Sequence, residues 1–156
     1  MRAIQYNRCM KTTRGKQFID EKFVRTGWIQ QKVADCRFAA VQMYETHVTD
    51  SEYVDCKFSA VNWRASKFRH VVFRNCIFDK VDFSGSELLS CQFLSCEWQE
   101  VNFTDCRTGV KKLVLDGTKI GVVAGLELLA GHTLTHEQAI GLLPTLLHEK
   151  GIAVEG

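Results

Sequence analysis

Residues 54–83 read VDCKF SAVNW RASKF RHVVF RNCIF DKVDF, so each block of five ends in an aromatic residue. Steps of five from Phe18 to Phe103 meet only apolar or aromatic residues, and the residues two places earlier, from Cys36 to Cys106, are all small. One large and one small side chain in every five therefore point to the interior. We expect the large core positions to include Phe38, Phe58, Phe68, Phe73, Phe78, Phe83, Phe93, Trp98 and Phe103. The matching small positions are Cys36, Val41, Cys56, Val61, Cys76, Val81, Cys96 and Val101.

This period excludes a plain helix, whose apolar stripe recurs every 3.6 residues, and a plain strand, whose faces alternate. It is typical of a short extended stretch followed by a turn, which makes one side of a coil. A second period of twenty indicates four sides, because it places Cys36, Cys56, Cys76 and Cys96 in one column. Successive coils would stack at about 4.8 Å and bond through their main chains, which explains why the chain has a single proline. The sequence predicts an all-β solenoid.

The blocks at residues 34–38, 54–58 and 74–78, which read ADCRF, VDCKF and RNCIF, resemble the units of the pentapeptide-repeat family. The resemblance implies a right-handed quadrilateral β-helix, strict over residues 34–108. It also implies a distant likeness to the quinolone-resistance members, which imitate duplex DNA and occupy type II topoisomerases. The ending from Leu134 to Gly151 resembles the helical tail of many bacterial members, and such tails can build two-fold dimers.

The two ends are expected to differ from the repeats. In residues 16–33 the small position falls on polar residues, so we expect an irregular first coil there, with residues 1–15 as a cap or arm. In residues 109–156, apolar residues at 113–115 and 120–123 indicate one or two closing strands. A helix should then begin after Thr135, with Gln138 as its capping-box partner, a kink at Pro144 and a stop at Gly151. Its apolar stripe would be Ala139, Ile140, Leu143, Leu146 and Leu147, and whether this stripe plugs the last coil or pairs with a second copy stays open.

Composition limits the class of protein. The chain has 156 residues, 46% hydrophobic and 24% charged, with a net charge of +2, which fits a folded domain and opposes both a strongly acidic DNA imitator and a strongly basic nucleic-acid binder. No segment has the length of a transmembrane helix or the apolar core of a signal peptide, so we expect a cytoplasmic protein without membrane contact. The seven cysteines are then expected to be thiols, buried in the core except for Cys9.

No group of residues predicts catalysis or a cofactor. The cysteines of one column would point in parallel, which suits neither the tetrahedral ligand set of zinc nor a disulfide. His132 and His136 would not share a helical face, because Thr135 caps the helix between them. Asp116 and Gly117 indicate a turn. We therefore expect no enzyme, no metal and no cofactor.

The leading hypothesis is a non-catalytic rod that binds a macromolecule of unknown identity through its outward side chains. A basic group at 67–74 that includes His70 and a weakly apolar patch of Val54, Val72, Leu89 and Leu94 are part of that outward surface. The possible partner surface comprises Arg37, Lys57, Lys67, Arg69, Arg74, Asp82 and Glu97.

Two other hypotheses stay open. A DNA-imitating binder of DNA gyrase or topoisomerase IV fits the repeat and the tail, but residues 34–108 carry eight basic and eleven acidic residues, a net −3, where a rod of roughly 18 Å needs about ten charges. A nucleic-acid binder would use the first 33 residues, which carry a net +6, but direct DNA binding is the weaker expectation. A homodimer through the C-terminal helix is compatible with all three hypotheses.

Overall fold

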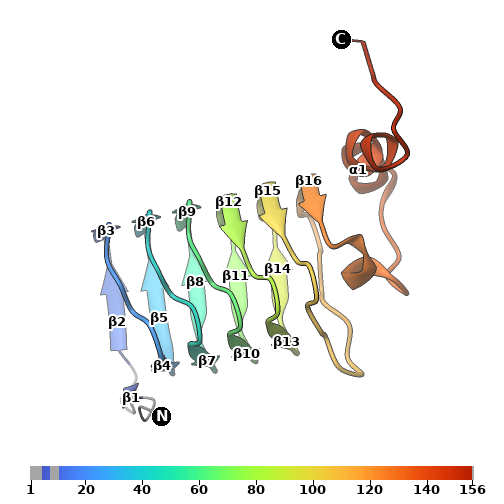
Figure 1. The fold of residues 1–156 in the computed structure, drawn as a ribbon. Coiled ribbons are helices and arrows are strands. Elements are labelled where there is room, and N and C mark those ends of the chain that lie inside the picture. The colour runs from blue at the N-terminus through green and yellow to red at the C-terminus, as the bar shows by residue number, and fades with distance from the viewer. Residues whose placement is uncertain (1–4, 8–10, 156) are drawn as a thin grey trace.

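The computed structural model describes residues 5–7 and 11–155, and in them the chain winds as a four-sided coil of parallel strands (Figure 1). Three sides are sheets. Sheet A contains β1 (Gln5–Asn7), β4 (Thr26–Ile29), β7 (His47–Thr49), β10 (Lys67–Arg69) and β13 (Glu87–Leu89). Sheet B contains β2 (Lys11–Arg14), β5 (Gln31–Ala34), β8 (Glu52–Val54), β11 (Val72–Arg74) and β14 (Gln92–Leu94). Sheet C contains β3 (Gln17–Ile19), β6 (Arg37–Ala39), β9 (Lys57–Ser59), β12 (Ile77–Asp82), β15 (Glu97–Asn102) and β16 (Lys119–Ala124).

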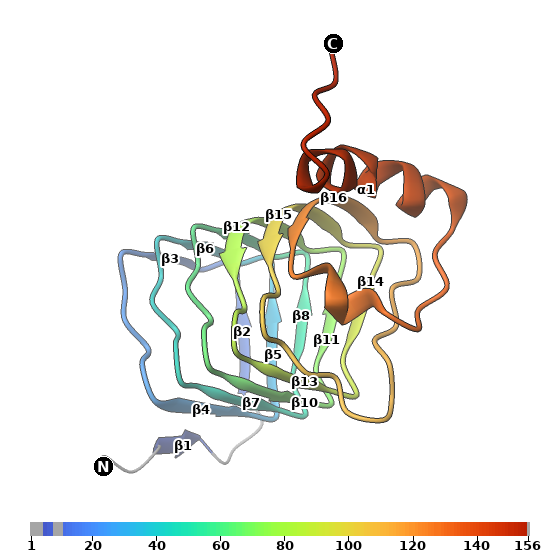
Figure 2. The same ribbon diagram turned by 45° about the vertical axis from the view of Figure 1, so that its right-hand side comes forward.

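A fourth side is held by isolated parallel bridges between Lys22, Gln42, Asn62 and Asp82. Over the repeats, each residue pairs with the residue twenty positions along the chain, as Phe58 does with Phe78. Figure 2 shows the coils as stacked rectangles of similar size. The expected quadrilateral β-helix with a C-terminal helix is confirmed.

Columns of aromatic rings fill the interior. Phe58 stacks between Phe38 and Phe78 with ring centroids 5.0 and 5.1 Å away, which is close to the spacing of neighbouring strands. Rings from adjacent sides meet edge to face, as Phe73 and Phe78 do at 5.2 Å. All seventeen of the expected core side chains named above are at most 3% exposed. The rings and the small side chains together form one packed core along the coil.

Polar side chains at the small positions form hydrogen bonds as well as filling the core. The hydroxyl of Ser66 accepts from the main-chain N–H of Thr46 and donates to the carbonyl of Met43, both on the preceding coil. Thiols take the same donor role, since the Cys56 Sγ lies 3.6 Å from the Val33 carbonyl oxygen. Cysteine and serine therefore suit the small position, because each is small and each bonds to the coil before it, whereas the valines at this position only pack.

The four corners are formed by residues in the left-handed region of backbone conformation. From Asp20 to Asp105, the residue two after each large core position has φ between 51° and 57°, except Gly85, with 71°, and Glu100, which does not have a positive φ. Aspartate and asparagine tolerate this conformation best, but alanine, lysine and arginine also adopt it here. The sequence did not indicate this feature, because few of these positions are glycine.

The N-terminal end is more regular than expected. β1 and β2 pair with β4 and β5, so residues 5–7 and 11–14 form part of a first coil instead of a separate arm. The pattern was hidden because the large position falls on Thr13 and the small position on Lys16. Cys9 lies outside the described residues.

The C-terminal end is closed by β16, a 3-10 helix η1 (Leu126–Leu129) that was not expected, and helix α1 (His136–Glu149). The capping box of Thr135 and Gln138 is present, as expected. α1 continues through Pro144 without ending there. Only the second expected closing segment is a strand, whereas the first joins the coil through one bridge between Val114 and Gln92.

Helix α1 docks on β16 through a face other than the expected stripe. Leu142 is buried, and the Gln138 amide nitrogen donates to the carbonyls of Leu115 and Thr118 at 2.9 and 3.0 Å. The expected stripe faces away, with Ile140 70% and Leu143 50% exposed. A polar residue and a glycine thus form much of the docking face, which an apolar periodicity does not detect.

Candidate binding surface

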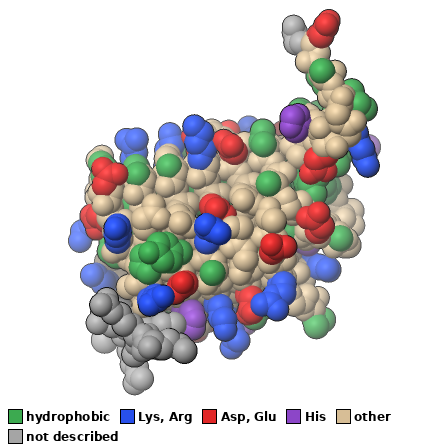
Figure 3. Space-filling model, viewed as in Figure 1, with side chains coloured by type: hydrophobic (Ala, Val, Ile, Leu, Met, Phe, Trp, Pro, Cys, Tyr) green, Lys and Arg blue, Asp and Glu red, His purple; other side chains and the backbone are tan. Residues whose placement is uncertain are grey.

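The outward side chains form columns that run along the rod, one residue from each coil. On sheet C one column contains Arg37, Lys57, Ile77, Glu97 and Lys119, placed side by side by strand pairing. On the fourth side the column Lys22, Gln42, Asn62 and Asp82 mixes a base, two amides and an acid. Figure 3 shows acidic and basic side chains interspersed on one face of the molecule. None of these columns is a continuous row of acids.

The seven residues expected to form a partner surface are distributed around the rod. Arg37, Lys57 and Glu97 share the column on sheet C. Lys67 and Arg69 lie on sheet A. The other two lie on further sides, Arg74 on sheet B and Asp82 on the fourth side. Three of the seven residues therefore share one column, and the other four lie on three other sides of the rod.

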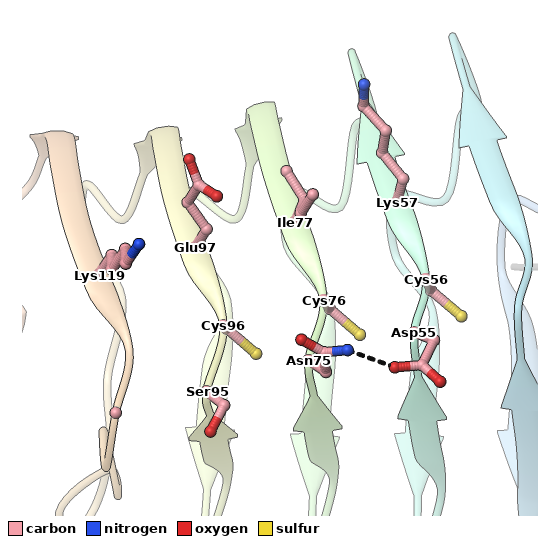
Figure 4. Close-up of a pocket in the computed structure, with 11 residues that line it drawn as sticks. Asp55, Cys56, Lys57, Asn75, Cys76, Ile77, Ser95, Cys96, Glu97 and Lys119 are labelled. Carbon is pink, nitrogen blue, oxygen red and sulfur yellow. Dashed lines mark hydrogen bonds between the residues drawn. The ribbon is translucent and has the colours of Figure 1, made fainter.

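A groove of about 690 Å³ follows the corner between sheets B and C, and we call it the corner groove. Its lining residues, drawn in Figure 4, are Asp55, Cys56, Lys57, Asn75, Cys76, Ile77, Ser95, Cys96, Glu97, Gly117 and Lys119. One wall is the corner column of Asp55, Asn75 and Ser95, and the other is the sheet C column from Lys57 to Lys119. The groove thus spans four coils and offers charged or polar groups on both walls.

Two internal contacts fix side chains of the corner groove. The Asn75 amide nitrogen donates to the Asp55 carboxylate at 2.5 Å, as the dashed line in Figure 4 marks. The Gln99 amide nitrogen donates to the Glu97 carboxylate at 3.1 Å. These contacts hold both carboxylates in place. Lys57, by contrast, is an exposed residue, and its ammonium group faces solvent.

The thiols below the groove are buried packing groups. Cys56, Cys76 and Cys96 are 1–2% exposed. Burial raises the pKa of the Cys76 thiol, whereas hydrogen bonds with Cys76 lower the pKa of the Cys56 and Cys96 thiols. Burial therefore keeps all three thiols from solvent. No group of three or more metal-ligating side chains occurs in the described residues.

The other motifs of the sequence have structural roles. Gly117 has a φ of +69°, and the N–H of Thr118 bonds to the Leu115 carbonyl, so the Asp116-Gly117 pair makes the expected turn. His136 is the first residue of α1 and His132 precedes the helix, so the two do not share a helical face.

A second hollow, of about 520 Å³, lies between residues 112–117 and the start of α1.

An apolar surface covers the C-terminal end, and we call it the α1 outer face. Its members are 43–70% exposed and come from β16, α1 and the segment after α1. They are Val122, Ile140, Leu143, Leu146, Ile152 and Val154. The weakly apolar patch expected on sheets A and B is only partly exposed at each residue.

Within the described part of the chain, no helix is long and apolar enough to cross a membrane.

Known proteins share this architecture. Residues 32–103 match the family model described as a pentapeptide repeat region. No curated protein sequence matches the chain. A trypsin-treated form of QnrB1, a plasmid-mediated fluoroquinolone resistance protein, superposes with a TM-score of 0.67 at 16% identity, covering 72% of this chain and 57% of QnrB1. Rfr23, a pentapeptide repeat protein from the cyanobacterium Cyanothece 51142, superposes with a TM-score of 0.58 at 8% identity, covering 72% of this chain and 83% of Rfr23. The chain thus spans little more than half of QnrB1, and at these identities the likeness concerns the fold.

Proposed function

Because this chain belongs to the pentapeptide-repeat family, we propose that it is a non-catalytic rod that binds a macromolecular partner through its outward side chains. The proposal rests on how each block of five divides its side chains between the core and the outer surface. Two side chains of each block fill the core, and the others form columns on the outside. A coil built in this way presents long patterned surfaces on its outside.

Rigid columns favour binding because little conformational entropy is lost on association. Main-chain bonds between coils hold each strand, as from Lys57 to Cys36 at 3.0 Å and from Ile77 to Cys56 at 3.0 Å. The backbone positions from which the outward side chains extend are therefore fixed. Charges of both signs on one side suit a partner with a complementary mixed surface, because electrostatic complementarity sets specificity.

A photo-crosslinking residue placed on each side of the rod tests the proposal. Suitable exposed positions are Lys57 on sheet C, Arg64 on the fourth side, Lys67 on sheet A and Arg74 on sheet B. In cells that express the protein, we expect a discrete adduct from one side or two adjacent sides. The proposal fails if no side gives an adduct above that of a buried control position, or if the purified protein turns over a substrate.

A second candidate function is occupancy of a type II topoisomerase by imitation of DNA. The fold likeness to QnrB1 favours it, and the mixed charge of the columns opposes it. A supercoiling assay with purified DNA gyrase, with and without a fluoroquinolone, decides between the two. Inhibition or protection by this protein would support the candidate, whereas the absence of both at a large molar excess would remove it.

We also propose that the α1 outer face joins two copies of the chain. One face of α1 docks on β16, so the opposite face is left with large apolar side chains in water, and burying them against a second copy favours association. Sedimentation velocity should show a dimer that the substitution Leu143→Glu converts to a monomer. A monomeric wild-type protein at high concentration would contradict this.

A further inference from the structure

Side chains recur along the corner groove at a regular spacing. That spacing matches some extended peptide conformations and not others. Stacked rings of successive coils lie 5.0 and 5.1 Å apart, so side chains two coils apart are separated by about 10 Å along the rod. A ligand lying along the groove meets Lys57, Ile77 and Glu97 on three successive strands. The two charged members are therefore about 10 Å apart, with an apolar side chain between them.

Of the two extended conformations of a peptide, one matches this distance. In a β-strand, residues on one face recur about every 6.7 Å, which fits neither one coil nor two. In a polyproline II helix, residues recur on one face every third position, at about 9.3 Å. A polyproline II ligand therefore keeps register with every second coil over the length of this groove.

The charges of the groove specify what the ligand must carry. Lys57 is exposed and presents a positive group, and Glu97 presents a carboxylate that accepts from the Gln99 amide. The lining also contains Asp55, which is bonded to Asn75, and Lys119, which lies next to Glu97 on the following coil. The corner wall adds the hydroxyl of Ser95, which Figure 4 shows on the far side of Cys96 from Glu97. A peptide with an acidic residue opposite Lys57 and a basic residue opposite Glu97 places each charge against its opposite.

We propose that the corner groove binds a polyproline II segment of a partner protein in which an acidic and a basic residue stand three positions apart. The proposal rests on the binding role proposed above and names the chemistry of one partner. The intervening residues contact Ile77, and proline suits them because it presets the polyproline II conformation. The low cost of ordering such a segment favours binding to a shallow surface.

Three labelled peptides of one composition test the spacing. They are Pro-Pro-Glu-Pro-Pro-Arg-Pro-Pro and two rearrangements with the charges two and four positions apart. By fluorescence anisotropy on the full chain, we expect the first peptide to bind about threefold or more tightly than the others. Equal affinities of the three peptides, or no binding by any of them, would overturn the proposal.

Matched variants test the place of binding. Lys57→Glu should weaken the first peptide several-fold, whereas Lys67→Glu, the same change on sheet A, should not. A peptide with arginine at both charged positions should bind Lys57→Glu better than wild type, because the substitution changes the groove lining from two acids and two bases to three acids and one base. Both variants change exposed residues, and equal melting temperatures exclude misfolding.

The outcomes separate this proposal from the proposed function. If Lys57→Glu and Lys67→Glu weaken the peptide equally, the groove is not its site, although crosslinks from the rod would still support a binding role. If no side of the rod yields a crosslink, the binding role itself fails, whatever the peptides do.

Discussion

Replacing Gly141 by alanine tests how α1 is held, because two effects of opposite sign compete. Alanine is the better helix former by about 1 kcal/mol, so propensity alone predicts a more stable protein. A Cβ at Gly141, however, would fall inside the contact distance of the Ile120 carbonyl oxygen. Ile120 is part of β16, which pairs with β15, so the oxygen has no room to move.

The magnitude follows from what α1 loses when it withdraws from β16. Leu142 is 6% exposed when docked, and exposing it costs about 2 kcal/mol. The two bonds from Gln138 contribute about 1 kcal/mol each. After the gain in propensity, Gly141→Ala should lower the free energy of unfolding by about 2–4 kcal/mol.

Urea unfolding gives the total change, and hydrogen exchange of residues 136–149 shows whether the loss is local. Protection of these amides should fall in Gly141→Ala and stay unchanged in Glu149→Ala, an exposed position on the same helix. A stabilised Gly141→Ala protein with protected α1 amides would refute the docking of α1 on β16.

Three further substitutions or conditions probe the coil. Thr118→Val should lower the free energy of unfolding by about 2–4 kcal/mol, as measured by urea unfolding. The Thr118 hydroxyl donates to the Phe93 carbonyl at 2.7 Å and accepts from a main-chain N–H, and valine loses both bonds. Thr118→Ser, which keeps the hydroxyl, should cost far less. Burial raises the pKa of Cys91 to about 12, above that of an exposed thiol, so its stabilising contribution is complete below about pH 8.5 and is lost as the pH rises toward 12. Alkaline titration of the unfolding free energy should show this decline, with a shallower slope in Cys91→Ser. At the corner residue Ala60, with a φ of 52°, valine should destabilise by about 1–2 kcal/mol and glycine should be tolerated; equal melting temperatures of the two variants would contradict the corner geometry.

The core was predictable because the period of the sequence is the period of the structure. A large residue at Phe58 and a small one at Cys56 recur every five positions, and both are buried at each recurrence from Cys36 to Phe103. The number of sides followed from the second period, which the pairing of Phe58 with Phe78 confirms. In the repeats, residue type alone therefore predicts which side chains are buried.

Features that depend on the main chain or on single polar contacts were not predictable. The corners adopt a left-handed conformation with residues such as Ala60 and Lys80, whose type gives no signal. The docking face of α1 depends on Gln138 and Gly141, and an apolar stripe therefore pointed to the wrong face.

The candidate site was predictable in part. Lys57 and Glu97 were expected on the surface, and their shared column follows from the period of twenty. The opposite wall of Asp55, Asn75 and Ser95 was missed, although the same period places these residues in one corner column. That this corner is hollowed depends on how the side chains of two adjacent sides lie in space, which a one-dimensional pattern does not combine.

The most direct test of the account is a nuclear Overhauser spectrum of the aromatic rings. The account predicts contacts between Phe38 and Phe58 and between Phe58 and Phe78, with amide contacts between residues twenty positions apart. A spectrum dominated by contacts three and four positions apart, with no contact between the rings of Phe58 and Phe78, would contradict the coil and every surface assigned to it.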